Sequence, residues 1–188
     1  MCAAPGGASP ATSIASRDPR ATVEFVQPLM SFVGRSAQLS AVTMLLREPG
    51  VRLLTLTGPG GVGKTRLAEV AADSVRDDFP DGIVFISFAA LQDSSRVPAV
   101  IADAFGLLSV TGEAFESRII NHARDKQMLL VLDNLEQLLP LPFLTRLLVT
   151  CEGVTILATS REVLRLTGEF EYVVPPLAVP APDADQAS

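Results

Sequence analysis

The sequence predicts an α/β fold in which a five-stranded, mainly parallel sheet lies between two layers of helices. Short apolar segments alternate with segments of helical periodicity along most of the chain. Most of the apolar segments show no polar alternation, which is typical of parallel strands buried on both faces. Such sheets bind ligands at the carboxyl ends of their strands, so the residues that directly follow each strand are the candidates for function.

The chain divides into three parts by composition. Residues 1–28 are rich in Ala, Pro, Ser and Gly and contain few large apolar groups, so we expect a flexible tail. An ordered domain is expected over residues 29–178. Residues 179–188 are Pro- and Ala-rich with a polar end, and we interpret them as a linker or a truncated C-terminus.

The elements of the ordered domain follow from periodicity and from turn residues. Ser36 is a plausible N-cap for the first helix. The helix at 113–124 is expected to place Phe115, Ile119 and Ala123 on one apolar face. The expected strands are 51–57, 83–88, 128–132, 154–158 and 171–174, and the expected helices are 36–46, 64–75, 98–108, 113–124 and 141–150, with one helical turn at 162–166.

Composition excludes several classes of function. The chain has 188 residues, 48% of them hydrophobic, which is enough for one α/β domain with a core. The net charge is −6 and no basic run occurs, which argues against direct nucleic-acid binding by this segment. Cys2 and Cys151 lie far apart, so no disulfide framework is predicted. No apolar run approaches membrane-spanning length and the first fifteen residues do not form a secretory signal, so a reducing cytoplasm is the expected location.

The first strand is followed by a glycine-rich segment, Gly58–Thr65, that fits the phosphate-binding pattern G-x-x-x-x-G-K-[ST]. Four glycines remove the Cβ atoms, so main-chain N–H groups can surround anionic oxygens, and a helix that begins near Gly63 adds its positive end. Lys64 is expected to reach the β- and γ-phosphates of a nucleotide, and the Thr65 hydroxyl is expected to ligate Mg²⁺.

The same glycines also form the dinucleotide pattern G-x-G-x-x-G, through Gly58, Gly60 and Gly63. That pattern requires an acidic residue at the end of the next strand to bind a ribose. The next strand ends in Phe-Ala-Ala. The dinucleotide pattern also gives no reason for a lysine and a threonine after the last glycine, so a triphosphate site is favoured.

Asp133 directly follows the apolar strand 128–132. A carboxylate there, opposite Thr65, would complete the Mg²⁺ site through water, whereas the alternative is an aspartate that caps a helix beginning at Asn134. Asn134 stands where many P-loop ATPases carry an acid that activates the attacking water, and an amide cannot take a proton at neutral pH. Glu136 is more simply interpreted as a solvated helix charge. We therefore expect slow or absent hydrolysis.

Five further positions are candidates for a local role. Arg161 follows the fourth strand at the start of a possible helical turn, where a cation is unfavourable unless an anion such as a γ-phosphate is present; the alternative is an ordinary surface arginine. Thr159 and Ser160 are expected to be turn or cap groups. Arg35 could contact nucleotide or merely flank a helix start. His122, the only histidine, has no Ser or Cys partner in view and is expected to be structural.

Several of these segments resemble the signal-transducing STAND ATPases. They are closest to the NB-ARC-like ATPase domain of large bacterial LuxR- and AfsR-type transcriptional regulators. The resemblance covers roughly residues 29–177 and implies a P-loop NTPase three-layer sandwich with strand order 5-1-4-3-2, which binds ATP or ADP with Mg²⁺ and acts as a switch. The segments that carry it are Phe32–Arg35, Gly58–Thr65, Leu129–Asn134, Thr159–Glu162, Gly168–Glu169 and Val174–Leu177.

The resemblance also implies roles for individual residues. Val33 and Arg35 would lie near the base and the ribose, and Arg161 would sense the γ-phosphate. Ser36 stands where the family usually has Glu after Gly-Arg. The expected catalytic residues are Lys64, Asp133 and Arg161, and the expected metal ligands are Thr65 and Asp133. The expected nucleotide contacts are Val33, Arg35, Gly58, Gly60, Gly61, Val62, Gly63, Lys64, Thr65 and Arg66.

The expected function is an ATP- or ADP-binding switch module with slow, Mg-dependent ATP hydrolysis, part of a signal-responsive transcriptional regulator. The family continues into helical and winged-helix subdomains beyond the point where this sequence stops, so those domains are the expected partners besides the nucleotide. Two alternatives are a small phosphotransferase, which would need an Arg-rich lid that the sequence does not show, and a non-hydrolysing interaction fragment. An ABC-type ATPase is not favoured because no L-S-G-G-Q run occurs.

Overall fold

The sheet has five strands, and all of its pairings are parallel. The computed structural model describes residues 34–107 and 114–176, so the predicted tail 1–28, Val33 and the predicted linker 179–188 lie outside the described residues. The spatial order is β2-β3-β4-β1-β5, which confirms the expected order 5-1-4-3-2. The strands are β1 (Leu53–Thr57), β2 (Ile83–Ser87), β3 (Met128–Asp133), β4 (Val154–Thr159) and β5 (Glu169–Val173).

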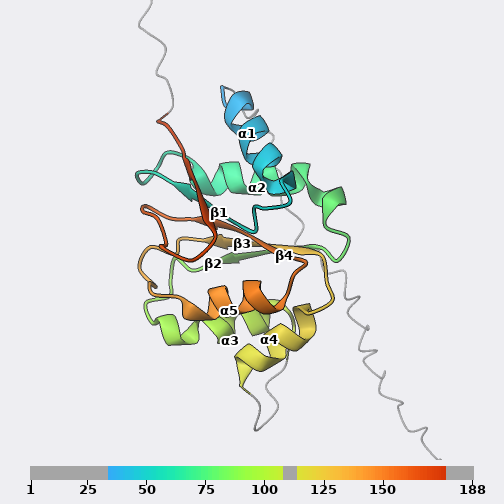
Figure 1. Cartoon of the computed structure of the whole chain (residues 1–188). Helices are drawn as coiled ribbons and strands as arrows, with labels where there is room; N and C mark the ends of the chain where they lie inside the picture. Colours follow the sequence, from blue (N-terminus) through green and yellow to red (C-terminus); the bar gives the residue numbers. More distant parts are fainter. Residues whose placement is uncertain (1–33, 108–113, 177–188) are drawn as a thin grey trace, which may run out of the picture.

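Helices cover both faces of the sheet and complete the predicted three-layer sandwich. Helices α1 and α2 lie over one face, and α3, α4 and α5 lie over the other (Figure 1). The helices are α1 (Ser36–Arg47), α2 (Lys64–Ser74), α3 (Val97–Ala104), α4 (Phe115–Ala123) and α5 (Pro142–Thr150), with short 3₁₀ turns at Arg76–Asp78 and Ser94–Arg96.

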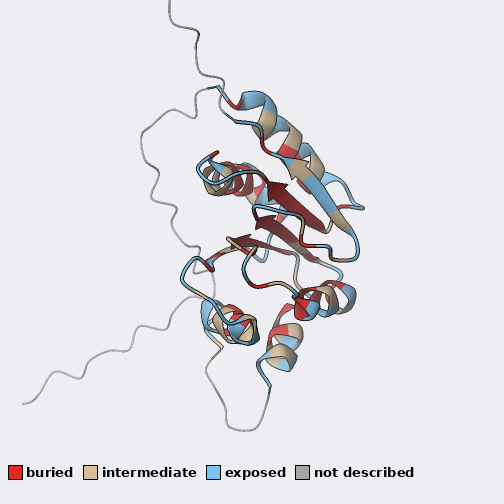
Figure 2. Cartoon of the chain, turned by 90° about the vertical axis from the view of Figure 1, so that its left-hand side faces the viewer, coloured by how far each residue is buried: buried red, intermediate tan, exposed pale blue. Residues whose placement is uncertain are grey.

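Each central strand contributes side chains to two separate cores. In β3, Leu130 and Leu132 pack toward α3, α4 and α5, whereas Leu129 and Val131 pack toward α1 and α2. Figure 2 shows the interior strands as the most deeply buried part of the chain. This two-sided burial explains why the strands read as continuous apolar segments rather than as alternating ones.

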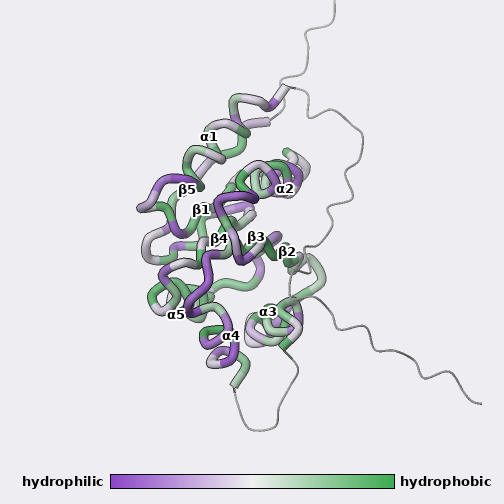
Figure 3. The backbone as a smooth tube through the Cα atoms, turned by 90° about the vertical axis from the view of Figure 1, so that its right-hand side faces the viewer, coloured by the Kyte–Doolittle hydropathy of each residue, from purple (hydrophilic) through white to green (hydrophobic). Residues whose placement is uncertain are grey.

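The fifth strand is different because it lies at the edge of the sheet. Its residues are exposed or only partly buried, and the chain there alternates between acidic and apolar residues. Figure 3 shows hydrophilic residues at this edge of the sheet. No helix within residues 34–107 and 114–176 combines the length and the apolar character needed to cross a membrane.

Several sequence-based expectations about helices are wrong in detail. The helix expected at 98–108 ends at Ala104, because Gly106 takes a left-handed conformation with φ of 67°. The N-cap of α1 is Arg35 rather than Ser36, and no side chain caps that end. The helical turn expected at 162–166 does not form, because Arg165 has a positive φ of 59°. Phe115, expected to share one apolar face with Ile119 and Ala123, is 37% exposed, whereas those two residues are buried.

Arg52, directly before β1, links the C-terminal end of α5 to the sheet through hydrogen bonds. Its guanidinium donates hydrogen bonds to the main-chain carbonyl oxygens of Leu148 at 2.9 Å and Val154 at 3.2 Å, and to that of Cys151. The last carbonyls of a helix have no partner within the helix, so a cation that donates to them is doubly favourable. Burial lowers the pKa of Arg52 because the charged form is desolvated, and the nearby Glu152 carboxylate offsets part of that effect.

Replacing Arg52 by methionine removes these donors while it keeps the aliphatic length. We expect the Arg52→Met variant to lose about 2 to 4 kcal/mol of unfolding free energy, since several partly buried carbonyls lose their partner. Urea unfolding measures this loss. The control is Arg47→Met at the exposed Arg47–Asp78 ion pair, where less than about 1 kcal/mol is expected. Equal losses in the two variants would contradict the role assigned to Arg52.

His122 packs within the protein rather than facing a site. Its ring lies against Phe105 with centroids 5.0 Å apart, and its Nε2 atom is 2.7 Å from Lys126 Nζ. Burial lowers the pKa of His122, and the neighbouring Lys126 charge adds to that effect. The surroundings of the ring fit the structural role expected for it.

The lowered pKa of His122 makes stability depend on pH. The folded protein binds the imidazole proton less readily than the unfolded chain, so stability should fall as pH drops below the ordinary histidine value of about 6.5 toward the lower folded value. The His122→Phe variant should lose that component of the slope. Melting temperatures between about pH 7.5 and pH 5.5 measure it. Parallel pH profiles for the two proteins would refute the assignment.

Candidate functional site

The segment between β1 and α2 forms an arch built on left-handed glycines. Gly58, Gly61 and Gly63 have φ values of 143°, 81° and 83°, which residues with a Cβ rarely adopt. A Cβ added to Gly58 would lie 3.0 Å from the main-chain oxygen of Val174. The arch therefore depends on glycine for its own conformation and for its close approach to the chain that leaves β5. Helix α2 begins directly after it at Lys64.

Lys64 lies over the arch. Its Nζ atom donates to the main-chain oxygens of Gly58 at 2.7 Å and Pro59 at 3.0 Å. These acceptors are neutral, whereas an anion in the arch would offer the ammonium stronger, charge-assisted hydrogen bonds. The side chain is thus held at the arch by contacts that a phosphate can replace.

Three other residues of the predicted nucleotide contacts have different surroundings. Val62 is buried in the core beneath α1 and α2, so any contact it makes with a ligand is through its main chain. Gly60 is exposed, with open space around it. Arg66 forms an ion pair with Glu69 on the same helix at 3.2 Å.

Asp133 lies at the centre of a hydrogen-bond network that joins three elements. Its Oδ1 atom accepts from Thr65 Oγ1 at 2.7 Å and from Thr159 Oγ1 at 2.5 Å. The Thr159 hydroxyl in turn accepts from the main-chain N–H of Asn134 at 3.1 Å. Asp133 is only 5% exposed. The structure thus brings the two residues expected to hold Mg²⁺ into direct contact, although they are 68 positions apart.

The strand order explains this meeting. Strand β4 lies between β1 and β3, so Thr159 at its end stands beside Asp133 at the end of β3. The first turn of helix α2 lies at the same edge and contains Thr65, whose hydroxyl donates to Asp133. A hydroxyl and a carboxylate are the hard oxygen donors that Mg²⁺ prefers, so the donor set fits this cation. The alternative role for Asp133 as a helix cap is wrong, because no helix begins at Asn134 and α5 starts only at Pro142.

Arg161 and Glu136 form an ion pair at the same edge of the sheet. Arg161 Nε lies 3.1 Å from Glu136 Oε1, and the two side chains are 71% and 20% exposed. Glu136 lies in a turn after β3, so its interpretation as a solvated helix charge is wrong. Arg161 does not stand at a helix N-terminus, because no helical turn follows it. The helix-end argument for an anion at Arg161 therefore does not apply.

Arg35 packs behind the glycine arch. It is 5% exposed, and its Cζ atom lies 3.9 Å from the position that a Cβ of Gly63 would take. Its Nη2 atom donates to the main-chain oxygen of Pro175 at 3.3 Å, and its Nη1 atom has no hydrogen-bond partner among the described residues. Arg35 both flanks the start of α1 and contacts the arch, so its two expected roles are compatible.

Sequence reasoning missed two contacts that shape this edge. Thr159, expected as a turn or cap group, also orients the Asp133 carboxylate; its position at the end of a strand was the available signal. Glu169 accepts from the main-chain N–H groups of Leu164 at 2.9 Å and Arg165 at 2.7 Å, which holds the loop after β4. No sequence pattern indicates that contact.

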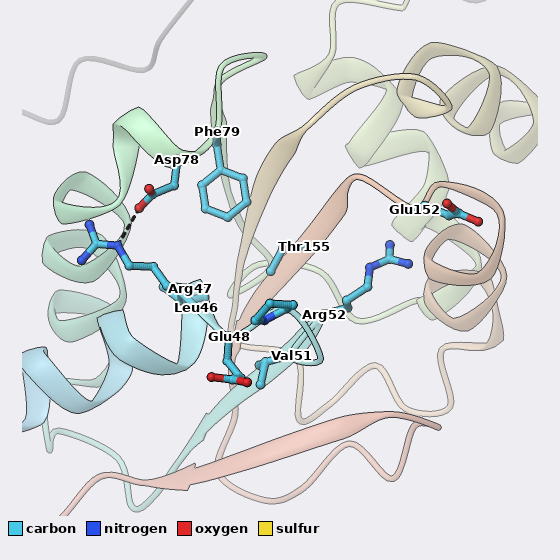
Figure 4. A pocket seen from close by; sticks show the side chains of 10 residues that line it. Leu46, Arg47, Glu48, Val51, Arg52, Asp78, Phe79, Glu152 and Thr155 are labelled. Atoms are coloured by element: carbon cyan, nitrogen blue, oxygen red, sulfur yellow. Dashed lines mark hydrogen bonds and ion pairs between the residues drawn. The ribbon is translucent and has the colours of Figure 1, made fainter.

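A hollow of about 390 Å³ lies at the opposite, amino-terminal edge of the sheet (Figure 4). Arg47 and Asp78 form a 2.8 Å ion pair beside it, and Arg52 is engaged with carbonyls of the α5 end. Parallel sheets bind ligands at their carboxyl edge rather than here. We assign no ligand to this hollow.

The fold and the carboxyl-edge site define a P-loop nucleoside triphosphatase domain: a parallel sheet in the order 2-3-4-1-5, a glycine arch with lysine and threonine after β1, and an aspartate after β3. The chain belongs to the AAA ATPase domain family, whose model matches residues 31–150.

Two proteins of Mycobacterium tuberculosis are similar in sequence. One, uncharacterised, is 38% identical over 153 residues, which cover 80% of this chain and 38% of that protein. The other, provisionally named an HTH-type transcriptional regulator, is 40% identical over 131 residues, which cover 68% of this chain and 14% of that protein. This chain therefore matches less than two fifths of the length of either relative.

Two solved structures share the fold. Cdc6p from Pyrobaculum aerophilum superposes with a TM-score of 0.60 at 20% identity, over 78% of this chain and 46% of that one. The ORC2 protein of Aeropyrum pernix, solved in complexes with ADPNP and ADP, superposes with a TM-score of 0.54 at 16% identity, over 80% and 50% of the two chains. At these identities the likeness establishes the fold alone.

Proposed function

We propose that this domain binds ATP or ADP together with Mg²⁺ and acts as a nucleotide-dependent switch with slow hydrolysis. The observation that carries the proposal is the 2.7 Å contact between Thr65 and Asp133 at the foot of a glycine arch that already holds Lys64. Membership of the AAA ATPase domain family supports it. The proposed location is the cytoplasm.

Each residue has a distinct task in this proposal. The arch supplies main-chain N–H groups to the phosphates, and Lys64 exchanges its carbonyl partners for phosphate oxygens. Thr65 and Asp133 hold the cation, and Thr159 keeps the Asp133 carboxylate oriented, as outer hydrogen-bond partners of metal ligands do. Bound Mg²⁺ neutralises charge on the phosphates.

Slow hydrolysis follows from the residues after β3. Asn134 occupies the position from which an acid would accept a proton from water, and an amide has no such capacity. Glu136 is the next carboxylate along the chain after Asp133, and it is paired with Arg161. A site that binds nucleotide tightly and turns it over slowly keeps each bound state long enough to be read by a partner.

We further propose that the domain is one part of a signal-responsive transcriptional regulator of the STAND type, with an NB-ARC-like nucleotide-binding domain of the LuxR or AfsR group. The relative provisionally named an HTH-type regulator supports this proposal, since the match occupies 14% of its length. The net charge of −6 gives this segment no electrostatic attraction to nucleic acid, so DNA contact falls to other domains of such a protein. Helical and winged-helix domains after this segment are the proposed partners.

Thermal melting with Mg-ADP tests nucleotide binding. At 100 times its dissociation constant a ligand adds roughly 2.7 kcal/mol of stability, which corresponds to a rise of about 5 to 10 °C for a domain of this size. The Lys64→Ala variant should lose most of the rise, because it loses the cation that contacts the phosphates. Arg47→Ala, at the opposite edge, should retain it. No rise in the native protein, or an equal rise in Lys64→Ala, would overturn the proposal.

A further inference from the structure

We propose that Glu136 sets how strongly the site prefers a nucleoside triphosphate to a diphosphate, by competing with the terminal phosphate for Arg161. The inference rests on the proposed function, because it concerns the same site. Its starting observation is the 3.1 Å ion pair between Glu136 and Arg161. Within the described residues, no hydrogen bond or ion pair joins either side chain to the arch. In this proposal the pair therefore acts on the terminal phosphate and not on the phosphates that the arch holds.

Both partners stand close to the Asp133 network. The main-chain N–H of Leu135, next to Glu136, donates to the Thr159 carbonyl oxygen at 3.1 Å. The N–H of Ser160, next to Arg161, donates to the Leu56 carbonyl oxygen at 3.1 Å, shortly before the arch. The loops after β3 and β4 are thereby fixed against the ends of β4 and β1. The ion pair spans these two loops at the edge where phosphate is proposed to bind.

Arg161 has an exposed side chain on a loop whose backbone is held in place. Glu169 holds the loop after β4 through two main-chain N–H groups, and the Arg161 side chain is 71% exposed. Glu136 is the more enclosed partner at 20% exposed, so it forms the fixed half of the pair. In this proposal Arg161 changes partner by rotation of its long, exposed side chain, while Glu136 stays in place.

The relative strengths of the two contacts give the direction of the effect. An exposed ion pair contributes little, whereas a guanidinium bound to a phosphate makes charge-assisted, often bidentate hydrogen bonds. Arg161 is therefore expected to break its ion pair with Glu136 and bind the terminal phosphate when a triphosphate is present. A diphosphate ends one phosphate earlier and leaves the ion pair intact. Glu136 thus lowers the affinity for the triphosphate selectively, because its contact must break only when that ligand binds.

The test measures dissociation constants for Mg-ADP and for Mg-bound AMP-PNP, a triphosphate analogue that is not hydrolysed, on the full chain. The proteins are native, Glu136→Gln, Arg161→Gln and the double variant. Glu136→Gln should raise the preference for AMP-PNP over ADP by roughly three- to fivefold, which is what an exposed ion pair at the strong end of its range can yield. In the Arg161→Gln background the same substitution should change the preference by less than about twofold.

Two controls separate this effect from general electrostatics and from damage to the fold. Glu136→Asp keeps the charge, so its preference should lie closer to native than that of Glu136→Gln. Melting temperatures without nucleotide report on stability. Asp78→Asn breaks a comparable exposed arginine pair at the opposite edge and should leave the preference unchanged.

Several outcomes would overturn the proposal. Equal strengthening of both nucleotides, or a shift that persists in the Arg161→Gln background, would mean that Glu136 acts by its charge alone. Loss of hydrolysis in Glu136→Gln without a change of preference would make it a residue that activates water. If the native protein binds neither nucleotide, the proposed function fails and this inference fails with it; if the native protein binds both and the preference does not move, only this inference fails.

Discussion

The carboxylate of Asp133 is shared by two hydroxyl groups that come from different parts of the fold, and the geometry of the whole edge depends on it. Thr65 reaches it from α2 and Thr159 from β4. A buried carboxylate is costly unless it accepts hydrogen bonds, so this network fixes the start of α2 and the ends of β3 and β4 relative to one another. It also places a hydroxyl and a carboxylate together beneath the glycine arch, where both would supply oxygen ligands to the proposed cation.

The arch has a second connection, to the chain that leaves β5. Gly58 approaches the Val174 carbonyl so closely that a Cβ would not fit, and Arg35 joins the side of Gly63 to the Pro175 carbonyl. A ligand that alters the arch therefore acts on contacts with the residues that lead away from β5. In a switch protein, these contacts would let the occupied site influence neighbouring parts of the molecule without a long-range pathway through the core.

Sequence reasoning predicted the parts of this structure that local rules determine. The glycine pattern fixes where α2 begins, and the carboxyl ends of parallel strands share one edge, so Asp133 and Thr65 were expected to meet. Contacts between loops were not predictable, because they depend on backbone conformations that no periodicity encodes. Arg165 adopts a positive φ, and residues 162–166 form no helical turn. Glu136 meets Arg161 across two loops. The role of Arg52 was likewise not predictable, because its carbonyl partner in α5 is far from it in sequence and adjoins it only in the folded chain.

The central claim is that Asp133 and Thr65 form the metal end of a nucleotide site. Calorimetric titration of ADP in the presence of Mg²⁺ and then of EDTA, on the native chain and on Asp133→Asn, tests it most directly. We predict that removal of Mg²⁺ weakens ADP binding to the native chain by about tenfold or more, and that Asp133→Asn loses most of this dependence while it still binds ADP. ADP binding that ignores Mg²⁺ in the native chain, or a variant with the native dependence, would contradict the claim.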